Sequence, residues 1–268
     1  MTVWDRSVAS GLAVASGFAV GVGQAFGRWA GTALDLVVPP LCMGCRRPIA
    51  DPRTLCGRCW PQLELIAPPI CDIMGTPLAF DAGPGARAPE LSWNHPLYDK
   101  ARAATVFGPL SRRLVHQLKY CDVPGVAALM ARLMAPAVVD VTTGADLLLP
   151  VPLHRRRLIA RRFNQAVQIA DALSAHTGLP VARHAMKRVR ATPRQVALNR
   201  QQRSDNLYNA FKVVDHDAIS GKHIVIVDDV LTTGATADAM AMCLRGAGAR
   251  SVRVAVFARV VPEDRDPR

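Results

Sequence analysis

One stretch, residues 223–236 (HIVIVDDVLTTGAT), constrains the fold of this 268-residue chain more than any other. It begins with four consecutive β-branched apolar residues, from Ile224 to Val227. A short run of this kind is typical of a strand buried on both faces, as in a parallel sheet. Two carboxylates, Asp228 and Asp229, follow the run, and a segment rich in Thr and Gly leads into an Ala-rich helical pattern. The order predicts a strand, a tight loop and a helix N-terminus.

The predicted loop has the chemistry of a phosphate site, because backbone N–H groups and hydroxyls at a helix N-terminus attract anions. Carboxylates at the end of the preceding strand suit the hydroxyls of a ribose. Asp228 and Asp229 are adjacent on a strand, so we expect their side chains to diverge rather than form a facing acid–base pair. An alternative is that they are ordinary turn residues, one of which caps the following helix. A Walker B acid is excluded because the chain has no G-x4-G-K-[ST] loop.

A second loop is strongly basic. The short apolar run 147–149 predicts a buried strand, and PVPLHRRRL follows it with Arg155, Arg156 and Arg157. The guanidinium group binds pyrophosphate oxygens through two parallel donors, so the loop is a candidate pyrophosphate site. A solvated basic loop or helix start is the alternative interpretation.

Positive charge is concentrated in the middle of the chain. The formal net charge is +12, and residues 151–203 hold twelve Lys and Arg against one acid, Asp171. This balance indicates a polyanionic partner or substrate. Phe163 is the one Phe, Tyr or Trp in the block, whereas a strong platform for stacking single-stranded nucleic acid needs several.

The remaining pattern alternates between strands and helices from about residue 95. The predicted strands are 103–107, 147–149, 179–182, 224–227 and 252–258. The predicted helices are 111–120, 123–135, 163–177 and 236–245. Residues 187–211 are basic and polar and fit no simple period. Alternation of this kind predicts an α/β fold with a doubly wound parallel sheet.

Four of the seven cysteines form two C-x2-C pairs, Cys42 with Cys45 and Cys56 with Cys59. This spacing suits tetrahedral thiolate coordination of a structural Zn2+, and a closed four-Cys set leaves no open position for catalysis. Free or redox-active thiols are the alternative. Cys71 stands where a third pair could begin, but no further pair follows, so a second zinc site is not expected. Unpaired cysteines of this number favour a reducing cytoplasm.

The patterns divide the chain into five parts. We expect a helical N-terminal extension at 1–38, a zinc ribbon at 39–80, a linker at 81–94, the α/β domain at 95–262 and a tail at 263–268. The apolar stretch 11–26 is short and weakly apolar for a membrane span, so a stable span is not expected. An amphipathic or buried helix, a misassigned start and a membrane anchor are the alternatives for this segment.

Taken together, residues 225–236 resemble the 5-phosphoribosyl-1-pyrophosphate (PRPP) signature of type I phosphoribosyltransferases. The resemblance implies that Asp228 and Asp229, the catalytic candidates, bind the ribose hydroxyls of PRPP with Mg2+. It implies that the loop wraps the 5-phosphate. The PRPP-binding candidates are Val227, Asp228, Asp229, Leu231, Thr232, Thr233, Gly234, Ala235 and Thr236.

Three further strings resemble the ComF family. They are PVPLHRRRL with RRFNQA, where Arg162 replaces the common Gly; the stretch 190–211, similar to RxTxxQxxLxxxxRxxNxxxAF; and QLKY at 117–120. In phosphoribosyltransferases the region equivalent to 190–211 is a flap that closes over the substrate and holds the pyrophosphate leaving group. Its candidates here are Thr192, Gln195, Arg203 and Asn206. Lys119 could approach the substrate, but a surface lysine is the default interpretation.

The ComF resemblance implies a type I phosphoribosyltransferase-like domain behind an N-terminal zinc ribbon. It also links the chain to DNA uptake in genetic competence and implies two functions, which can coexist in one protein. In the first, the protein is an enzyme that transfers a phosphoribosyl group from Mg2+–PRPP to an acceptor, here unidentified. In the second, it handles single-stranded DNA during genetic competence, together with a helicase or recombination proteins, and keeps only a vestigial PRPP site.

Overall fold

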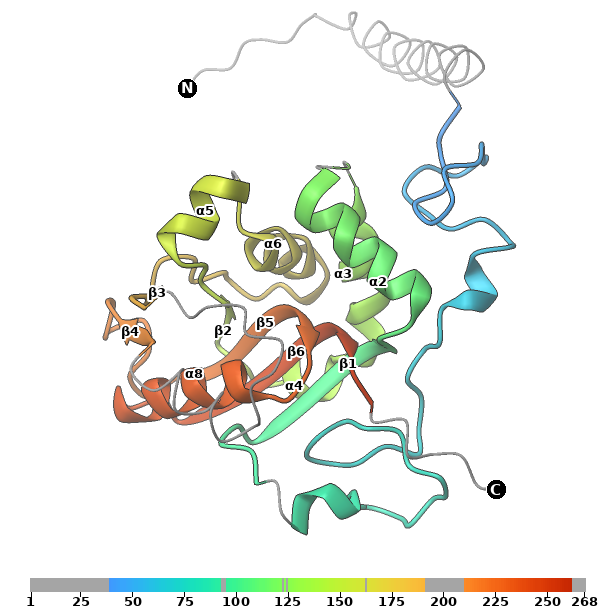
Figure 1. Ribbon diagram of the computed structural model, residues 1–268. Helices are drawn as coiled ribbons and strands as arrows, with labels where there is room; N and C mark the ends of the chain where they lie inside the picture. The colour runs from blue at the N-terminus through green and yellow to red at the C-terminus, as the bar shows by residue number, and fades with distance from the viewer. Residues whose placement is uncertain are drawn as a thin grey trace, which may run out of the picture.

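The computed structural model describes residues 39–92, 95–121, 123, 125–161, 163–190 and 210–261 (Figure 1). Several predictions lie outside these residues: the helical extension 1–38, the tail 263–268, Arg162, and the flap candidates Thr192, Gln195, Arg203 and Asn206. Within the described part, an α/β domain is preceded by a segment with little regular structure.

The centre of the domain is a four-stranded parallel sheet with the order β1-β6-β5-β2. Its strands are β1 (Lys100–Val106), β2 (Leu147–Pro150), β5 (His223–Leu231) and β6 (Ser251–Arg259). The predicted parallel sheet is therefore confirmed. Strand β5 is longer than the apolar run suggested, because it continues through both aspartates to Leu231 and pairs with β6 as far as Arg259.

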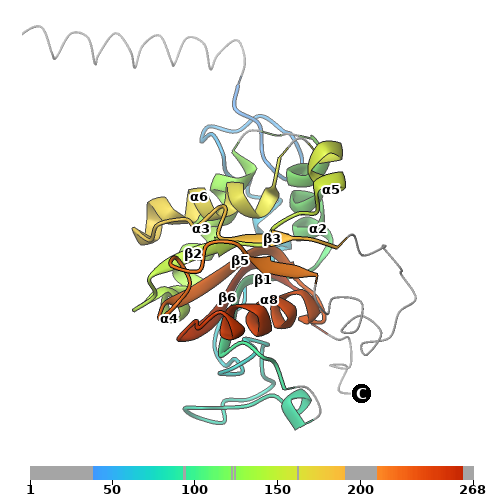
Figure 2. The same cartoon turned by 90° about the vertical axis from the view of Figure 1, so that its left-hand side faces the viewer.

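Helices cover both faces of this sheet (Figure 2). Helices α2 (Pro109–His116), α3 (Val126–Ala137) and α6 (Gln165–Thr177) lie on one face, and α8 (Ala235–Gly246) lies on the other. Side chains of a strand alternate between faces. Val225 and Val227 accordingly join the core under α3 and α6, whereas Ile224 and Ile226 join the core over α8. All four side chains are fully buried, as the apolar run predicts.

The remaining elements are short. They are η1 (Trp60–Gln62), η2 (Pro89–Ser92), the π-helix η3 (Gln117–Cys121), α4 (Val139–Thr142), α5 (Arg155–Arg161), β3 (Met186–Arg188) and β4 (Phe211–Val213). The antiparallel pair β3–β4 was not predicted, because its strands lie at the two ends of the aperiodic stretch 187–211 and are only three residues long each.

Two predicted elements differ from the structure. The helix expected over 111–120 is α-helical only to His116 and then widens into η3. The strand expected over 179–182 is reduced to a single parallel bridge between Val181 and Leu148. Pro180 supplies no N–H to a ladder, which limits pairing at that position.

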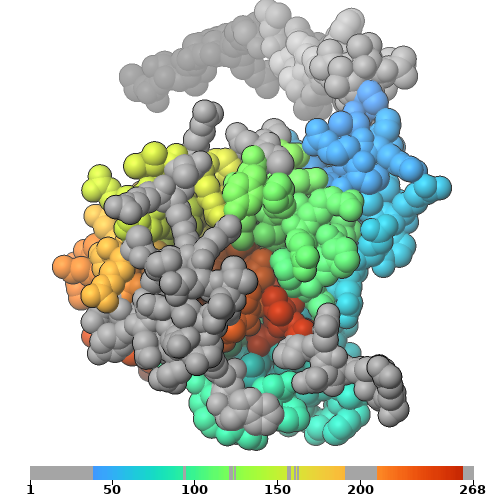
Figure 3. All heavy atoms as spheres, in the orientation of Figure 1, coloured from blue at the N-terminus to red at the C-terminus, as the bar shows by residue number. Residues whose placement is uncertain are grey.

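The segment before the domain covers the outer edge of β1. Its backbone makes three hydrogen bonds there: Val106 N–H to Glu64 O at 2.9 Å, Ile66 N–H to Ala104 O at 3.0 Å, and Ala101 N–H to Ile73 O at 2.7 Å. An uncovered edge strand invites pairing with other chains, so this segment completes the sheet. In the space-filling view its blue atoms lie directly against the green α2–α3 region (Figure 3).

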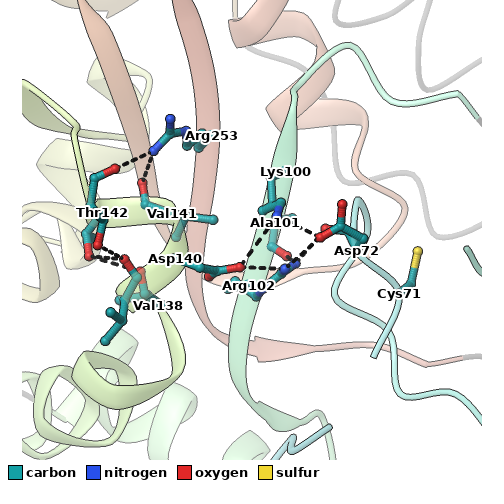
Figure 4. A network of polar contacts seen from close by, with 12 residues as sticks. Cys71, Asp72, Lys100, Ala101, Arg102, Val138, Asp140, Val141, Thr142 and Arg253 are labelled. Atoms are coloured by element: carbon teal, nitrogen blue, oxygen red, sulfur yellow. Dashed lines mark hydrogen bonds and ion pairs between the residues drawn. The ribbon is translucent and has the colours of Figure 1, made fainter. Parts of the chain in front are cut away.

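A polar network reinforces that junction (Figure 4). Arg102 of β1 is 6 % exposed and reaches both Asp72 of the preceding segment and Asp140 of α4. Its Nη2 lies 2.5 Å from an Asp140 carboxylate oxygen, and its Nη1 donates to Asp72 O at 2.9 Å. Lys100 Nζ lies 2.7 Å from the Asp72 carboxylate, and this ammonium lowers the pKa of Asp72.

Candidate functional site

The predicted phosphate loop lies at the carboxyl end of β5. The strand ends at Leu231, Gly234 forms the N-cap and α8 begins at Ala235, so the loop opens onto a helix N-terminus as predicted. Gly234 has a φ of 84°, in the left-handed region that favours glycine. Thr232 is exposed, and Thr233 and Thr236 are half-buried, so all three residues are at least partly accessible from solvent.

Two of the predicted PRPP-binding residues have side chains in the core. Val227 is fully buried and Leu231 is 5 % exposed. Their carbonyl groups are also occupied, since Val227 O accepts from Val151 N–H at 3.0 Å and Leu231 O accepts from Val260 N–H at 2.9 Å. These positions hold the loop in place rather than offering a side chain to a ligand.

The two aspartates point to opposite faces of β5, as expected for adjacent strand residues. Asp228 is half-buried and Asp229 is 6 % exposed. The carboxylate of Asp228 accepts a hydrogen bond from the Asp229 N–H at 2.9 Å. Burial raises the pKa of Asp228 to about 8, and the neighbouring charge of Asp229 adds to the rise. In the free protein Asp228 therefore holds its proton up to about pH 8, beside the nearly buried Asp229.

Lys119 supplies the counter-charge. It lies in η3, its side chain is 21 % exposed, and its ammonium forms an ion pair with the Asp229 carboxylate. The default interpretation of Lys119 as a surface lysine is therefore wrong. Sequence spacing gave no sign of the contact, because the two residues are far apart in the chain and meet only when α2 packs on the sheet. The string QLKY was the one available signal.

The Arg-rich loop follows β2, the strand beside β5. Asn164 fixes the start of this loop: its Nδ2 donates to Val151 O at 3.0 Å, and its side-chain oxygen accepts from Ala166 N–H at 3.1 Å as the N-cap of α6. Arg155 is the exposed first residue of α5. The structure does not describe the side chains of Arg156 and Arg157.

Helix α5 is tied to η3 as well. Arg161 Nη2 donates to the Tyr120 hydroxyl at 3.2 Å, and its guanidinium carbon lies 5.2 Å from the centre of that ring. Tyr120 follows Lys119 directly, so one π-helical turn contacts both Asp229 of β5 and the helix that carries the predicted pyrophosphate arginines. π-Helical turns inside helices are frequent at functional sites.

The four predicted zinc ligands come together. The sulfur atoms of Cys42, Cys45, Cys56 and Cys59 all lie within 4.8 Å of one another. Cys45 Sγ and Cys56 Sγ are 3.6 Å apart, close to the sulfur separation of about 3.8 Å in a tetrahedral site with Zn–S bonds near 2.3 Å. The donor set fits a structural Zn2+.

Backbone groups prepare these thiols for a metal. A hydrogen bond from the Cys59 backbone is the largest influence that lowers the pKa of Cys56 to about 6. Burial opposes ionisation of Cys42, but N–H groups that include those of Cys56, at 3.1 Å, and Gly44, at 3.3 Å, lower its pKa. Burial raises the pKa of Cys59 to about 12. Zn2+ binding would displace the remaining protons.

The turn at residues 41–48 carries the first two zinc-ligand cysteines and is called the first knuckle. The turn at residues 70–77, the second knuckle, has a similar backbone. An antiparallel bridge joins the ends of residues 41–48, and another joins the ends of 70–77. In both, the N–H of the cysteine donates to a carbonyl five residues later, at 2.8 Å for Cys42 and 2.7 Å for Cys71.

The interior of the second knuckle is apolar. Met74 occupies the position of Cys45, and Ala88 and Leu91 pack with it around the buried Cys71. Ala88 and Leu91 belong to the stretch 81–94 that the sequence predicts as a linker, and these two side chains pack into the second knuckle, whereas residues 81–85 are exposed. Cys71 is the single thiol here, so a four-ligand zinc set is absent from this knuckle among the described residues.

Two family models match the chain. The double zinc ribbon domain matches residues 33–89, and the phosphoribosyl transferase domain matches residues 164–268. The second knuckle is thus the second ribbon of a double ribbon, with apolar residues where the first has thiols. None of the described helices has the length and apolar character needed to cross a membrane.

Relatives match along most of the chain. DNA utilization protein YhgH of Salmonella typhimurium is 33% identical over 235 residues, covering 84% of this chain and 100% of the relative. The protein of the same name from Escherichia coli K12 is 32% identical over 232 residues, again 84% and 100%. Competence protein F of Haemophilus influenzae is 29% identical over 229 residues, covering 81% and 96%.

Among solved structures, glutamine PRPP amidotransferase from B. subtilis, complexed with ADP and GMP, is 21% identical to this chain. The match covers 53% of this chain and 30% of that one, with a TM-score of 0.34.

Proposed function

Because the chain belongs to the family of DNA utilization protein YhgH and has a phosphoribosyl transferase domain, we propose that it binds PRPP with Mg2+ at the carboxyl ends of β5 and β2. One observation carries this proposal: a helix N-terminus behind a Thr/Gly loop, a carboxylate pair and an Arg-bearing loop lie at the ends of two neighbouring strands. A nucleoside monophosphate would need only the first two features, whereas PRPP also needs a group for its pyrophosphate.

Each part has a distinct role. Loop residues Thr232 to Thr236 hold the 5-phosphate through N–H groups and hydroxyls. Asp228 and Asp229 bind the ribose hydroxyls, and their hard oxygen donors also fit Mg2+. Mg2+ held by these carboxylates would neutralise charge on the pyrophosphate. Arg155, with Arg156 and Arg157, contributes cationic donors to the same group.

In the transfer reaction, the C1–O bond to pyrophosphate breaks and pyrophosphate leaves with the electron pair. The acceptor's nitrogen lone pair forms the new C1–N bond, and an N–H proton is lost to water where the acceptor has one. The carboxylates stabilise positive charge that develops on the ribose. Positioning and electrostatic stabilisation supply the acceleration, so the chain needs no covalent nucleophile.

Calorimetry with PRPP, with and without Mg2+, tests the proposal. Wild-type protein is expected to show Mg2+-dependent binding that Asp228→Asn and Asp229→Asn each weaken at least tenfold. Asp217→Asn is the matched control, because Asp217 is exposed and lies before β5 at the opposite end of the sheet. Wild-type protein that binds no PRPP with Mg2+ would refute the proposal.

A second candidate function is DNA handling in genetic competence, with or without turnover of PRPP. The basic block 151–203 and the names of the relatives favour it. Binding through phosphate contacts alone is nonspecific and falls steeply with salt. Filter binding of single-stranded DNA at about 50 and about 200 mM salt, roughly the range over which such contacts weaken, tests it. DNA that is not retained even at the lower salt excludes direct binding.

A further inference from the structure

Two arginines are buried among the described residues, and they differ in their partners. Arg102 is 6 % exposed and contacts the carboxylates of Asp72 and Asp140. Arg259, the last residue of β6, is 4 % exposed, and none of the ion pairs among the described residues includes it. A buried cation without an anion is costly, so the position of Arg259 requires a compensating partner.

The backbone of Arg259 lies beside the start of the proposed phosphate loop. Arg259 is paired with Leu231, the last residue of β5, and the next residue, Val260, donates its N–H to Leu231 O at 2.9 Å. The loop residues 232–234 follow Leu231 directly and lead into α8. Adjacent strands lie about 4.8 Å apart, so Arg259 is one strand away from the point where the loop begins.

Tyr98 connects the side chain of Arg259 to the loop. Tyr98 is 4 % exposed, and a Cβ added to Gly234 would lie 3.7 Å from its hydroxyl oxygen. Burial raises the pKa of this hydroxyl, whereas the charge of Arg259 and a hydrogen bond from it oppose the rise. A guanidinium group can only donate, so Tyr98 accepts in this contact and keeps its own proton.

The segment that carries Tyr98 is fastened to α8, the helix onto which the loop opens. Leu97 N–H donates to Asp238 Oδ1 at 2.7 Å, and Arg245 Nε donates to Leu97 O at 3.2 Å. Arg245 Nη2 also lies 2.5 Å from a carboxylate oxygen of Asp99. Both Asp238 and Arg245 belong to α8, so the hydroxyl of Tyr98 has a fixed place relative to the helix N-terminus.

The second knuckle holds the same guanidinium group. Arg259 Nη1 donates to Met74 O at 2.7 Å. The Nε of Arg259 is buried and has no hydrogen-bond partner among the described residues. Buried polar groups are nearly always hydrogen-bonded, so a buried cation with a free donor beside a proposed anion site requires an explanation. A ligand with negative charge in the loop supplies one, because it compensates the charge of Arg259.

We propose that Arg259 is a positioning residue for the phosphate group that binds in the loop 232–236. Its fixed positive charge stabilises the phosphate dianion from behind the loop, and its contact with Tyr98 holds Gly234 in place. The second knuckle keeps the guanidinium group there through Met74 O, and so contributes to ligand binding without a zinc ion of its own. The inference rests on the proposed function in one respect, which is that the loop binds a phosphate; it requires neither pyrophosphate binding nor transfer.

The first test uses ribose 5-phosphate as the probe, titrated into the full-length zinc-loaded protein in a calorimeter. Arg259→Met is expected to weaken its binding about tenfold, because a charge-assisted interaction is lost. Arg259→Lys keeps the charge and is expected to recover part of that affinity. Tyr98→Phe keeps the ring but removes the hydroxyl beside Gly234, and is expected to weaken binding several-fold. Equal affinity in the wild type and Arg259→Met would overturn the inference.

The second test is the ionisation of the bound phosphate, which a purely structural role of Arg259 would leave unchanged. Phosphorus NMR of bound ribose 5-phosphate over about pH 5.5 to 7.5 gives the second pKa of the phosphate, which is about 6 in water. A nearby positive charge favours the dianion and lowers this pKa. The pKa is therefore expected to be lower in the wild type and Arg259→Lys than in Arg259→Met. The same pKa in all three proteins would contradict the inference.

Arg253→Met is the matched control. Arg253 lies towards the other end of β6 and donates to Val141 O at 3.3 Å and to Thr143 O at 2.8 Å. Its replacement also removes hydrogen bonds to carbonyl groups, but is expected to leave the affinity for ribose 5-phosphate and the phosphate pKa unchanged. If Arg259→Met does not fold, Tyr98→Phe decides the test, and wild-type affinity in that variant would overturn the inference.

This inference and the PRPP proposal fail separately. Binding of ribose 5-phosphate that depends on Arg259, in a protein that does not bind PRPP with Mg2+, supports the inference and refutes the PRPP proposal. Mg2+-dependent PRPP binding that is equally strong in Arg259→Met and Arg253→Met removes the inference and leaves the PRPP site standing. Wild-type protein that binds no ribose 5-phosphate removes the phosphate assignment of the loop, and the inference with it.

Discussion

The ammonium group of Lys119 forms an ion pair with the carboxylate of Asp229, and this contact joins η3 to the end of β5. It places a cation against the pair of carboxylates that the proposed function assigns to ribose and Mg2+. Because the next residue, Tyr120, contacts Arg161 of α5, the same turn spans both halves of the proposed PRPP site.

Replacement of Lys119 by Met is expected to destabilise the protein. Asp229 is nearly buried, and loss of its partner leaves a poorly hydrated charge, which costs roughly 1–3 kcal/mol of the free energy of unfolding. Urea denaturation measures the change. Arg183→Met is the matched control, because the ion pair of Arg183 with Asp171 is exposed and such pairs contribute under about 1 kcal/mol. Equal losses in the two variants would contradict the structural role of the Lys119 pair.

The pKa of Asp228 predicts how stability depends on pH. Its folded-state pKa of about 8 exceeds the value near 4 that an aspartate has in an unfolded chain. The folded protein therefore binds more protons than the unfolded chain between these values, so this contribution to stability is lost as pH rises towards 8. Urea denaturation from pH 6 to 9 in the presence of zinc is expected to show this fall, and Asp228→Asn to lack it.

The same shift affects ligand binding. Mg2+ and ribose hydroxyls interact with the ionised carboxylate, so the affinity for Mg2+–PRPP is expected to increase as pH rises to about 8. Calorimetry at about pH 6.5, 7.5 and 8.5, which roughly bracket that value, measures the trend. An affinity that decreases over this interval would be inconsistent with a protonated Asp228 in the free protein.

Two glycines of the zinc ribbon are expected to respond differently to substitution. A Cβ added to Gly44 would lie 2.7 Å from Cys59 Sγ, too close for either atom, whereas a Cβ on Gly57 would meet nothing within 4 Å. Gly44→Ala is therefore expected to displace Cys59 and weaken zinc binding. Gly57→Ala is expected to retain one zinc per chain. Zinc content after dialysis against a mild chelator distinguishes them, and equal content would show that the ribbon adapts to the added methyl group.

Arg102 is expected to hold the double ribbon against the sheet. Arg102→Met removes a buried cation that bridges Asp72 and Asp140 (Figure 4). Both carboxylates remain partly hydrated, so the free energy of unfolding is expected to fall by roughly 1–3 kcal/mol. Limited proteolysis is expected to cut within residues 64–92 faster than in the wild type. Lys100→Met, which removes the more exposed partner of Asp72, should have a smaller effect.

The sequence by itself determined the features that depend on local pattern. Four β-branched residues before two carboxylates and a Thr/Gly loop specify a strand, a turn and a helix start, because burial of the strand and the geometry of glycine act over a few residues. The two C-x2-C pairs specify a four-thiolate set in the same way. The parallel sheet followed from the alternation of such elements.

Only the tertiary structure decided which distant residues meet. The periodicity of residues 111–120 gives a helix but not the widening at Gln117 that turns Lys119 towards Asp229. The pairing of residues 64–73 with β1 depends on an unpaired sheet edge, which no short window of sequence reveals. No local sequence pattern distinguishes Met74 and Ala88 from other apolar residues. Only the fold shows that they lie where a second zinc ribbon would hold its ligands. Long-range packing, rather than local propensity, selects these contacts.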